Sequence, residues 1–232
     1  RSRHSSTASA TLASSPGQVR AVAKAGTGVE PTGRPLVQRL GEIRFADDFA
    51  RDPEAEPLWT PVAGRFAPSA SHTPGTSQGA FEFWGVAPGA RGIALANASH
   101  WFWDDCEAGV SGRGSADSAW GLVVCFRDAD NWRAAVVDPR HGDVRVMART
   151  DGREEILHRE SLPLRAAQWY RLTVAMHDGS RAVFLNGRRI LADEDARWTG
   201  GRVGLLVETS DDGELGATFD DVEVRSLPTP AE

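Results

Sequence analysis

Two acidic motifs near the ends of the chain carry side chains that could bind a metal ion. Asp47 and Asp48 lie in FADDF, and Asp220 and Asp221 lie in FDDVEV. Calcium takes several carboxylate and carbonyl oxygens at about 2.4 Å, and two terminal strands lying side by side would bring these acids together. The alternative, which we favour, is that the acids cap turns and pair with arginines, because adjacent residues of a strand point to opposite faces. Calcium is the only cofactor for which the sequence gives a case.

The chain has eight tryptophans, which is many for one domain. An exposed indole can stack on the apolar face of a sugar ring while Asp, Asn and Arg side chains hydrogen-bond the hydroxyl groups. A platform of this kind could be formed by Trp101, Trp103, Arg127, Asp130, Asn131 and Trp132. The alternative is a tryptophan-rich core with surface turns, and for most of the indoles this is the better interpretation.

Asp105 and Glu107 are two residues apart on one expected strand, which suggests the carboxylate pair of a retaining glycosidase. Any same-face pair in an acidic β protein gives this signal, so we expect no catalytic residues here. The six histidines are scattered without metal-ligand spacing, and neither G-x-S-x-G nor a phosphate-binding loop occurs.

Cys106 and Cys125 are the only cysteines. A hairpin centred on the loop near residues 112–118 could place them opposite each other, and a disulfide would then be worth roughly 3 kcal/mol and imply an oxidising compartment. Two buried free thiols are the equally weighted alternative, because sequence alone does not fix the geometry.

The elements that must position these residues are clearest at residues 169–191, which predict two consecutive hairpins. Asp178-Gly179 and Asn186-Gly187 are pairs that tolerate the positive φ of type I′ turns, and alternating polarity flanks both. The first turn sets Met176 opposite Arg181, Val174 opposite Val183 and Leu172 opposite Leu185, and the second sets Val183 opposite Ile190. The core face should hold Tyr170, Leu172, Val174, Met176, Val183, Leu185 and Ile190.

Short alternating segments continue along the chain and number about a dozen, without a segment of helical period. The fold class expected from them is all-β, a two-sheet antiparallel jelly-roll sandwich with an extended N-terminal arm. The arm comprises residues 1–35, which are rich in Ser, Ala, Gly, Thr and Pro. The sandwich should span residues 36–226, and residues 227–232 form a short tail. No apolar run is long enough to cross a membrane.

Six segments in order resemble the laminin-G-like, concanavalin A-like jelly-roll family, especially its branch of bacterial 3-keto-disaccharide hydrolase-like domains. They are FADDF (residues 45–49), GLVVCFRDADNW (121–132), WYRLTV (169–174), LNG (185–187), GRVGL (201–205) and FDDVEV (219–224). The resemblance implies the sandwich fold, and it implies that the domain binds sugars, binds proteins or braces a neighbour. Laminarinase-like members carry E-x-D-x-x-E on one strand, and DDCEAG at residues 104–109 lacks that spacing.

Charge is unevenly distributed. Residues 1–41 hold six basic side chains and one acid, whereas the whole chain has a net charge of −6. An acidic body repels phosphate, so nucleic acid is not an expected partner. The chain begins without Met, which either a removed export signal or trimming would explain.

We therefore expect a non-catalytic, extracytoplasmic module. It would act as an accessory subunit that braces a larger assembly, such as a bacterial respiratory or photosynthetic membrane complex. The arm that would bind other protein subunits carries Arg1, Arg3, Arg20, Lys24 and Arg34. The alternative is a carbohydrate-binding module or a keto-glycoside hydrolase.

Overall fold

The computed structural model describes residues 41–50, 57–71, 80–87, 89–96, 103–195, 197–210 and 216–227. The chain divides into two units, Arg1–Val37 and Gln38–Glu232, and all described residues lie in the second. The predicted arm lies outside the described residues, as does all of the predicted tail except Leu227. Both boundaries therefore stay predictions.

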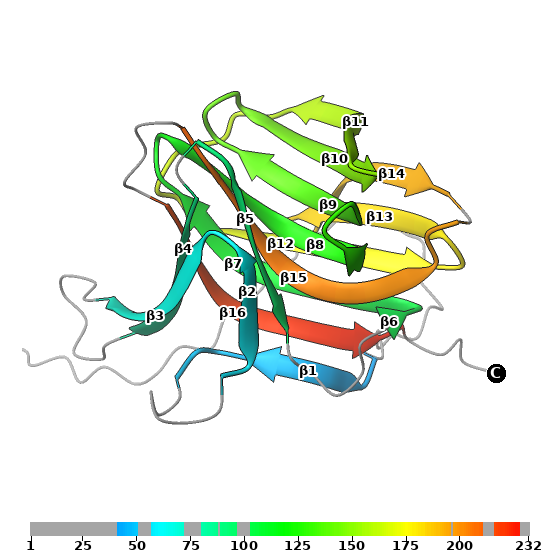
Figure 1. The fold of residues 1–232 in the computed structure, drawn as a ribbon, viewed down its shortest axis with the longest axis horizontal. Helices are drawn as coiled ribbons and strands as arrows, with labels where there is room; N and C mark the ends of the chain where they lie inside the picture. The colour runs from blue at the N-terminus through cyan, green and yellow to red at the C-terminus, as the bar shows by residue number, and fades with distance from the viewer. Residues whose placement is uncertain are drawn as a thin grey trace, which may run out of the picture. The chain divides into compact units, whose positions relative to one another are not determined.

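The described residues form two antiparallel sheets, which confirms the expected all-β jelly-roll sandwich (Figure 1). The first sheet has the order β14-β13-β12-β7-β16-β4-β3, with β1 paired to β16. Its strands are β1 (Ile43–Asp47), β3 (Arg65–Ser71), β4 (Ala80–Val86), β7 (Cys106–Gly114), β12 (Tyr170–His177), β13 (Ser180–Leu185), β14 (Arg188–Glu194) and β16 (Ala217–Ser226).

The second sheet has the order β11-β10-β9-β8-β15-β5-β2, with β6 paired to β15. Its strands are β2 (Trp59–Ala63), β5 (Arg91–Ala96), β6 (Trp103–Asp104), β8 (Ser118–Asp128), β9 (Asn131–Asp138), β10 (Asp143–Thr150), β11 (Arg153–Ser161) and β15 (Gly200–Thr209). The described part of the chain contains no helix, and accordingly no helix that could span a membrane.

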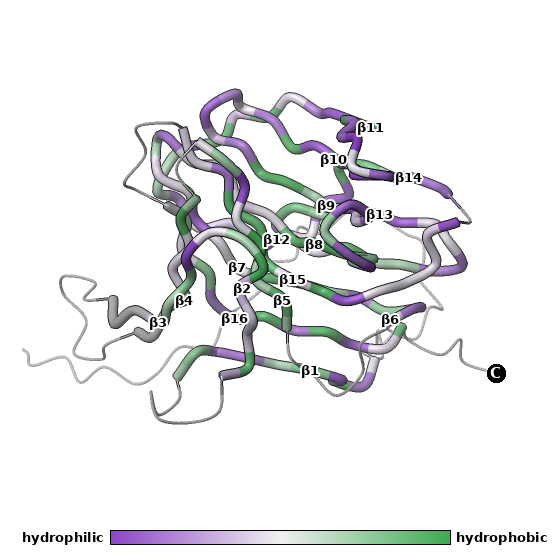
Figure 2. Tube along the Cα trace, viewed as in Figure 1, coloured by the Kyte–Doolittle hydropathy of each residue, from purple (hydrophilic) through white to green (hydrophobic). Residues whose placement is uncertain are grey.

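The main core lies between the sheets, where the inward faces of the strands meet. Its largest fully buried members include Trp120, Leu122, Leu172, Leu205 and Phe219. A second, smaller apolar cluster forms on the outer face of the second sheet, around Trp132, Val136 and Met147. The central strands of this sheet are therefore apolar on both faces, and Figure 2 shows hydrophobic colour along β8, β9 and β15 while β11 is hydrophilic.

The two hairpins confirm the sequence prediction and correct it at one residue. Asp178, Gly179, Asn186 and Gly187 all have positive φ, between 45° and 77°, and the three predicted pairs across the first turn are present. In the second hairpin Val183 lies opposite Leu191 rather than Ile190, because a β-bulge shifts the register between Val183 and Phe184. The bulge leaves the Ile190 side chain partly buried.

The prediction of a hairpin between the two cysteines was wrong. β7 belongs to the first sheet and β8 to the second, so the chain crosses the sandwich between them. Cys106 and Cys125 are free, fully buried thiols, and the Cys125 Sγ lies 3.7 Å from the Met176 Sδ. Burial raises the pKa of the Cys106 thiol to about 12, and it also raises the pKa of Cys125.

Candidate functional site

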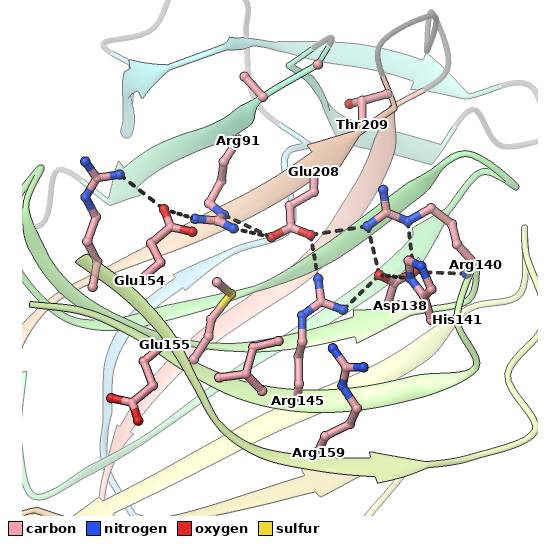
Figure 3. Close-up of a pocket in the computed structure, with 15 residues that line it drawn as sticks. Arg91, Asp138, Arg140, His141, Arg145, Glu154, Glu155, Arg159, Glu208 and Thr209 are labelled. Carbon is pink, nitrogen blue, oxygen red and sulfur yellow. Dashed lines mark hydrogen bonds and ion pairs between the residues drawn. The ribbon is translucent and has the colours of Figure 1, made fainter. Parts of the chain in front are cut away.

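A cavity of about 860 Å³ opens on the outer face of the second sheet (Figure 3). Side chains from β5, β9, β10, β11, β15 and the turn between β9 and β10 line it. The ionisable members are Arg91, Asp138, Arg140, His141, Arg145, Arg149, Glu154, Glu155, Arg159 and Glu208, and Met147 and Ile156 are apolar. Five arginines thus face four carboxylates in one hollow.

Asp138 organises one end of the cavity. Its carboxylate is fully buried and accepts hydrogen bonds from Arg140 Nε and Nη2 at 2.9 and 2.8 Å and from Arg145 Nη1 at 2.8 Å. His141 Nδ1 lies 2.9 Å from the same group. Burial acts to raise the pKa of Asp138, but the hydrogen bonds from Arg140, Arg145 and His141 outweigh it and hold that pKa well below its usual range.

Glu208 joins the two ends of the cavity. Its Oε1 accepts from Arg91 Nη2 at 2.6 Å, and its Oε2 accepts from Arg145 Nη2 at 2.5 Å. Arg91 continues the chain of charges to Glu154 at 2.5 Å. Burial acts to raise the pKa of Glu154, but hydrogen bonding to Arg91 lowers it overall. These side chains form one continuous network in Figure 3.

Apolar residues of the sheet lie beneath the charged side chains, and two of them, Met147 and Ile156, line the cavity. Trp132 is only 2% exposed and lies beneath Arg91, whose guanidinium carbon is 5.1 Å from the ring centroid. Met147 is buried, whereas Ile156 is 46% exposed at the rim. Ala119 lies opposite Glu208 on the neighbouring strand, and its small side chain leaves room for long side chains to meet above the sheet.

Local sequence explains how these residues are positioned. Residues 143–150 alternate, so that Val144 and Val146 enter the main core while Arg145 and Met147 face outward. The Asp138 carboxylate also accepts from the Arg140 backbone N–H at 3.0 Å, which caps the turn into β10. This alternation of arginine with apolar residues is the signal that could have found the cavity, and the sequence interpretation did not use it.

The structure does not assemble the predicted tryptophan platform. Trp103 and Trp132 are each 2% exposed and pack as core residues, and Trp101 lies outside the described residues. The alternative of a tryptophan-rich core therefore holds for both described indoles. Trp103 is buried in the main core, and Trp132 is buried in the smaller apolar cluster on the outer face of the second sheet.

None of the polar residues of the predicted platform lines the cavity, and one of them contacts a residue that does. Asp130 forms an ion pair of 3.1 Å with Arg149, a lining residue, and Asn131 Oδ1 accepts from the Asp151 backbone N–H. Arg127 stacks instead over Trp198, at 4.7 Å. The turn thus braces one wall of the cavity.

The terminal strands β1 and β16 pair as expected, but the four acids do not gather. Asp47 is buried and accepts from Trp59 Nε1 at 2.6 Å and from the Phe49 N–H at 2.8 Å. Asp48 caps the Ala50 N–H, and Asp220 accepts from the Asp221 N–H. Within the described ranges no group of three or more His, Cys, Asp or Glu side chains could hold a metal ion. Calcium binding stays an untested prediction.

Asp105 and Glu107 are separated by a break in the strand that was expected to carry both. Asp105 has a φ of 38° between β6 and β7. Its exposed carboxylate accepts from the Asp178 N–H at 2.9 Å and lies 3.2 Å from His177 Nδ1. This side chain holds a turn of the neighbouring hairpin.

Comparison with known proteins supports the fold. No family model matches the chain, and no curated protein sequence matches it. A family 66 carbohydrate-binding module from Bacillus subtilis matches with a TM-score of 0.59 and 21% identity, over 73% of this chain and 96% of that one. A protein of unknown function with a galectin-like fold, also from Bacillus subtilis, matches with a TM-score of 0.60 and 12% identity, over 81% and 97%.

A solved structure titled as a native glycosidic hydrolase is also similar, with a TM-score of 0.53 and 10% identity over 79% of this chain and 97% of that one. The neighbours therefore include a binding module and a hydrolase on one architecture, and identities this low show the fold alone. The described part of the chain is a concanavalin A-like jelly-roll sandwich.

Proposed function

We propose that this domain binds carbohydrate, without cleaving it, in the cavity on the outer face of the second sheet. The observation that carries the proposal is the network of paired arginines and carboxylates beside the exposed apolar side chain of Ile156. Sugar rings present hydroxyl groups at their edges and C–H groups on their faces, so a site for them needs alternating donors and acceptors beside an apolar contact. A carbohydrate-binding module among the structural neighbours supports the proposal.

The pairing of charges favours a neutral sugar. Arg91 and Arg145 each contact at least two carboxylates, and Arg140 is held by Asp138 and Glu208. An anionic ligand would have to compete with these carboxylates for the same guanidinium groups. A neutral hydroxyl group can instead accept from an N–H and donate to a carboxylate oxygen without breaking the ion pairs.

The same carboxylates do not suit glycosidase chemistry. A general acid for glycoside hydrolysis must keep its proton near neutral pH, which requires a raised pKa. Arginines lower the pKa of both Asp138 and Glu154, so these two groups are ionised and serve as acceptors.

Affinity electrophoresis in gels containing neutral or uronate-bearing polysaccharides tests the proposal. Glu154→Gln and Arg159→Gln change the rim, where the side chains are 36% and 50% exposed, so both variants should fold. Each should lose most of the retardation that a neutral polysaccharide causes. Arg188→Gln, on exposed β14 of the other sheet, is the matched control and should bind normally. Equal retardation of all three variants and the unchanged protein would contradict the proposal.

An accessory role in a larger protein assembly stays a prediction, because it rests on an arm outside the described residues. The extracytoplasmic location also stays a proposal. The free cysteines remove the disulfide as an argument for it.

A further inference from the structure

A second, smaller cavity of about 340 Å³ lies on the outer face of the first sheet. Ser111 of β7, Asp220 and Asp221 of β16, and residues 169–171 at the start of β12 line it. Trp169 is 36% exposed, one of few large apolar side chains that reach the surface of the described chain. Because the two sheets enclose the main core, this cavity and the larger one open on opposite faces of the sandwich.

Strand register brings the lining residues into one row. Ser111 pairs with Arg171 on one side and with Asp220 on the other. All three are partly exposed, while their chain neighbours Gly112, Tyr170 and Phe219 face inward and are buried. A hydroxyl, a guanidinium and a carboxylate therefore lie side by side next to the indole.

The Trp169 and Arg171 side chains are each held in place by a neighbouring group. Arg113 stacks over Trp169 with its guanidinium carbon 4.9 Å from the ring centroid, which fixes the orientation of the indole. Arg171 donates to the backbone oxygen of Asp221. A Cβ added to Gly109 would come within 2.7 Å of Arg171 Nη2, so the guanidinium lies directly over this glycine.

A β-bulge shapes the remaining wall. The register between β16 and β7 shifts between Asp220 and Glu223, and Asp221 has a φ of 49°. A non-glycine residue with positive φ is uncommon and costs conformational energy. The bulge turns two successive carboxylate residues toward the same cavity, which a regular strand cannot do.

We propose that this second cavity is a separate carbohydrate site that holds one neutral sugar ring against Trp169. The indole contacts the C–H face of the ring, while Asp220 and Ser111 accept from its hydroxyl groups and Arg171 donates to them. Its volume lies at the lower end of the range for small-molecule sites, about 300 to 1,000 Å³, which fits a single residue better than a long chain. The domain would then hold two glycans on opposite faces. The site stands on its own residues and does not require the larger cavity to bind sugar.

Nuclear magnetic resonance of the indole N–H groups tests this proposal. The probes are neutral methyl glycosides of glucose, galactose, mannose, xylose and fructose, and Trp169→Phe assigns the Trp169 resonance. At least one glycoside should shift this resonance in a saturable way. Asp220→Asn should weaken the interaction by roughly tenfold, because a neutral amide is a poorer acceptor than a carboxylate. Trp84, which is half-buried on β4 of the same sheet and outside the cavity, provides the control resonance.

The outcomes separate the two sites. Glu154→Gln should leave the shift of the Trp169 resonance unchanged, even if the larger cavity binds nothing. If none of the five glycosides moves the Trp169 resonance, or if the Trp84 resonance moves equally, the second site is disproved. Binding at the larger cavity is judged separately from the retardation of Glu154→Gln and Arg159→Gln.

Discussion

A buried carboxylate with several cationic partners holds together the end of the larger cavity near the β9–β10 turn. Replacing Asp138 by Asn keeps one oxygen to cap the turn but removes the charge that faces Arg140 and Arg145. Removing one partner of a buried ion pair costs about 3 to 5 kcal/mol. We expect a loss of about 3 kcal/mol in the free energy of unfolding, measured by urea denaturation at neutral pH. Asp151→Asn, in the exposed turn between β10 and β11, should unfold like the unchanged protein, and equal stability of both variants would refute this role of Asp138.

The same residue makes a prediction about pH. The pKa of Asp138 is lower in the folded protein than in the unfolded chain, where it is about 3.9. Such a group contributes its full stability above the unfolded pKa and loses it as pH falls toward the folded pKa. The urea midpoint should thus stay level from neutral pH to about pH 5 and fall below about pH 4. Asp138→Asn should show a shallower fall, and parallel curves for the two proteins would contradict the assignment.

The thiols give a prediction that separates free cysteines from a disulfide. Cys106 and Cys125 are both 0% exposed, and the pKa of Cys106 is raised to about 12. A thiol reacts as the thiolate, so neither cysteine should react with Ellman's reagent in the folded protein at mildly alkaline pH. Both should react in urea without a reductant. A protein that releases no thiol in urea would have the disulfide that the structure lacks.

At this scale the sequence allowed prediction of backbone positions better than of the site. The turns at Asp178-Gly179 and Asn186-Gly187 were predictable because positive φ restricts which residues can occupy them. The cavity was not, because Arg91, Asp138, Arg145 and Glu208 come from four strands and only the sheet order brings them together. The sequence correctly placed Trp132 at the start of a strand, but it did not predict that Arg91 covers the indole.

The space that neighbouring residues leave at a glycine decides how much a substitution by alanine costs. Gly187 lies in an open turn with a φ of 77° and nothing within 4 Å of an added Cβ, so Gly187→Ala should cost only the backbone strain of about 1 kcal/mol. Gly121 lies in β8, where an added Cβ would be 2.2 Å from the Ala135 backbone oxygen. Gly121→Ala should therefore cost at least about 3 kcal/mol or prevent folding. Urea midpoints of the two variants measure the difference, and a reversed order would show that β8 is not packed as described.

Register shifts explain where element-scale prediction failed. Alternation and turn type fix the pairs across the first hairpin, but the bulge at Ile190 inserts a residue that periodicity cannot anticipate. The prediction that β7 and β8 form a hairpin failed for a different reason. A short loop can join two strands of one sheet or two strands of different sheets. Which of the two arrangements forms depends on how both strands are buried.

The whole molecule has two outer faces with different chemistry. The second sheet carries paired charges over an apolar cluster, and the first carries an exposed indole beside a bulge. The sandwich fold was predictable because six segments follow in the order of one family. The faces were not, since the outward residues of each strand can serve either solvation or binding.

The last prediction concerns which part of the chain the sandwich needs. β1 lies at the start of the described residues and pairs with β16 near the other end. It contributes Phe45, whose ring packs edge-on against Trp59 at 5.8 Å, and it leads into Phe49, which stacks on Phe83 at 5.1 Å. Asp47 adds the hydrogen bond to Trp59. Removal of residues 1–37 spares all of these contacts, whereas removal of residues 1–50 deletes them.

We expect the shorter truncation to keep the free energy of unfolding within about 0.5 kcal/mol of the full chain, because it leaves these buried contacts in place. The longer truncation should lose at least about 4 kcal/mol, since burying one phenylalanine is worth about 3 to 5 kcal/mol against alanine and two are removed. Urea denaturation followed by circular dichroism measures both. A large loss in the shorter truncation would mean that residues 1–37 contribute to the sandwich, and a small loss in the longer one would mean that β1 does not close the core.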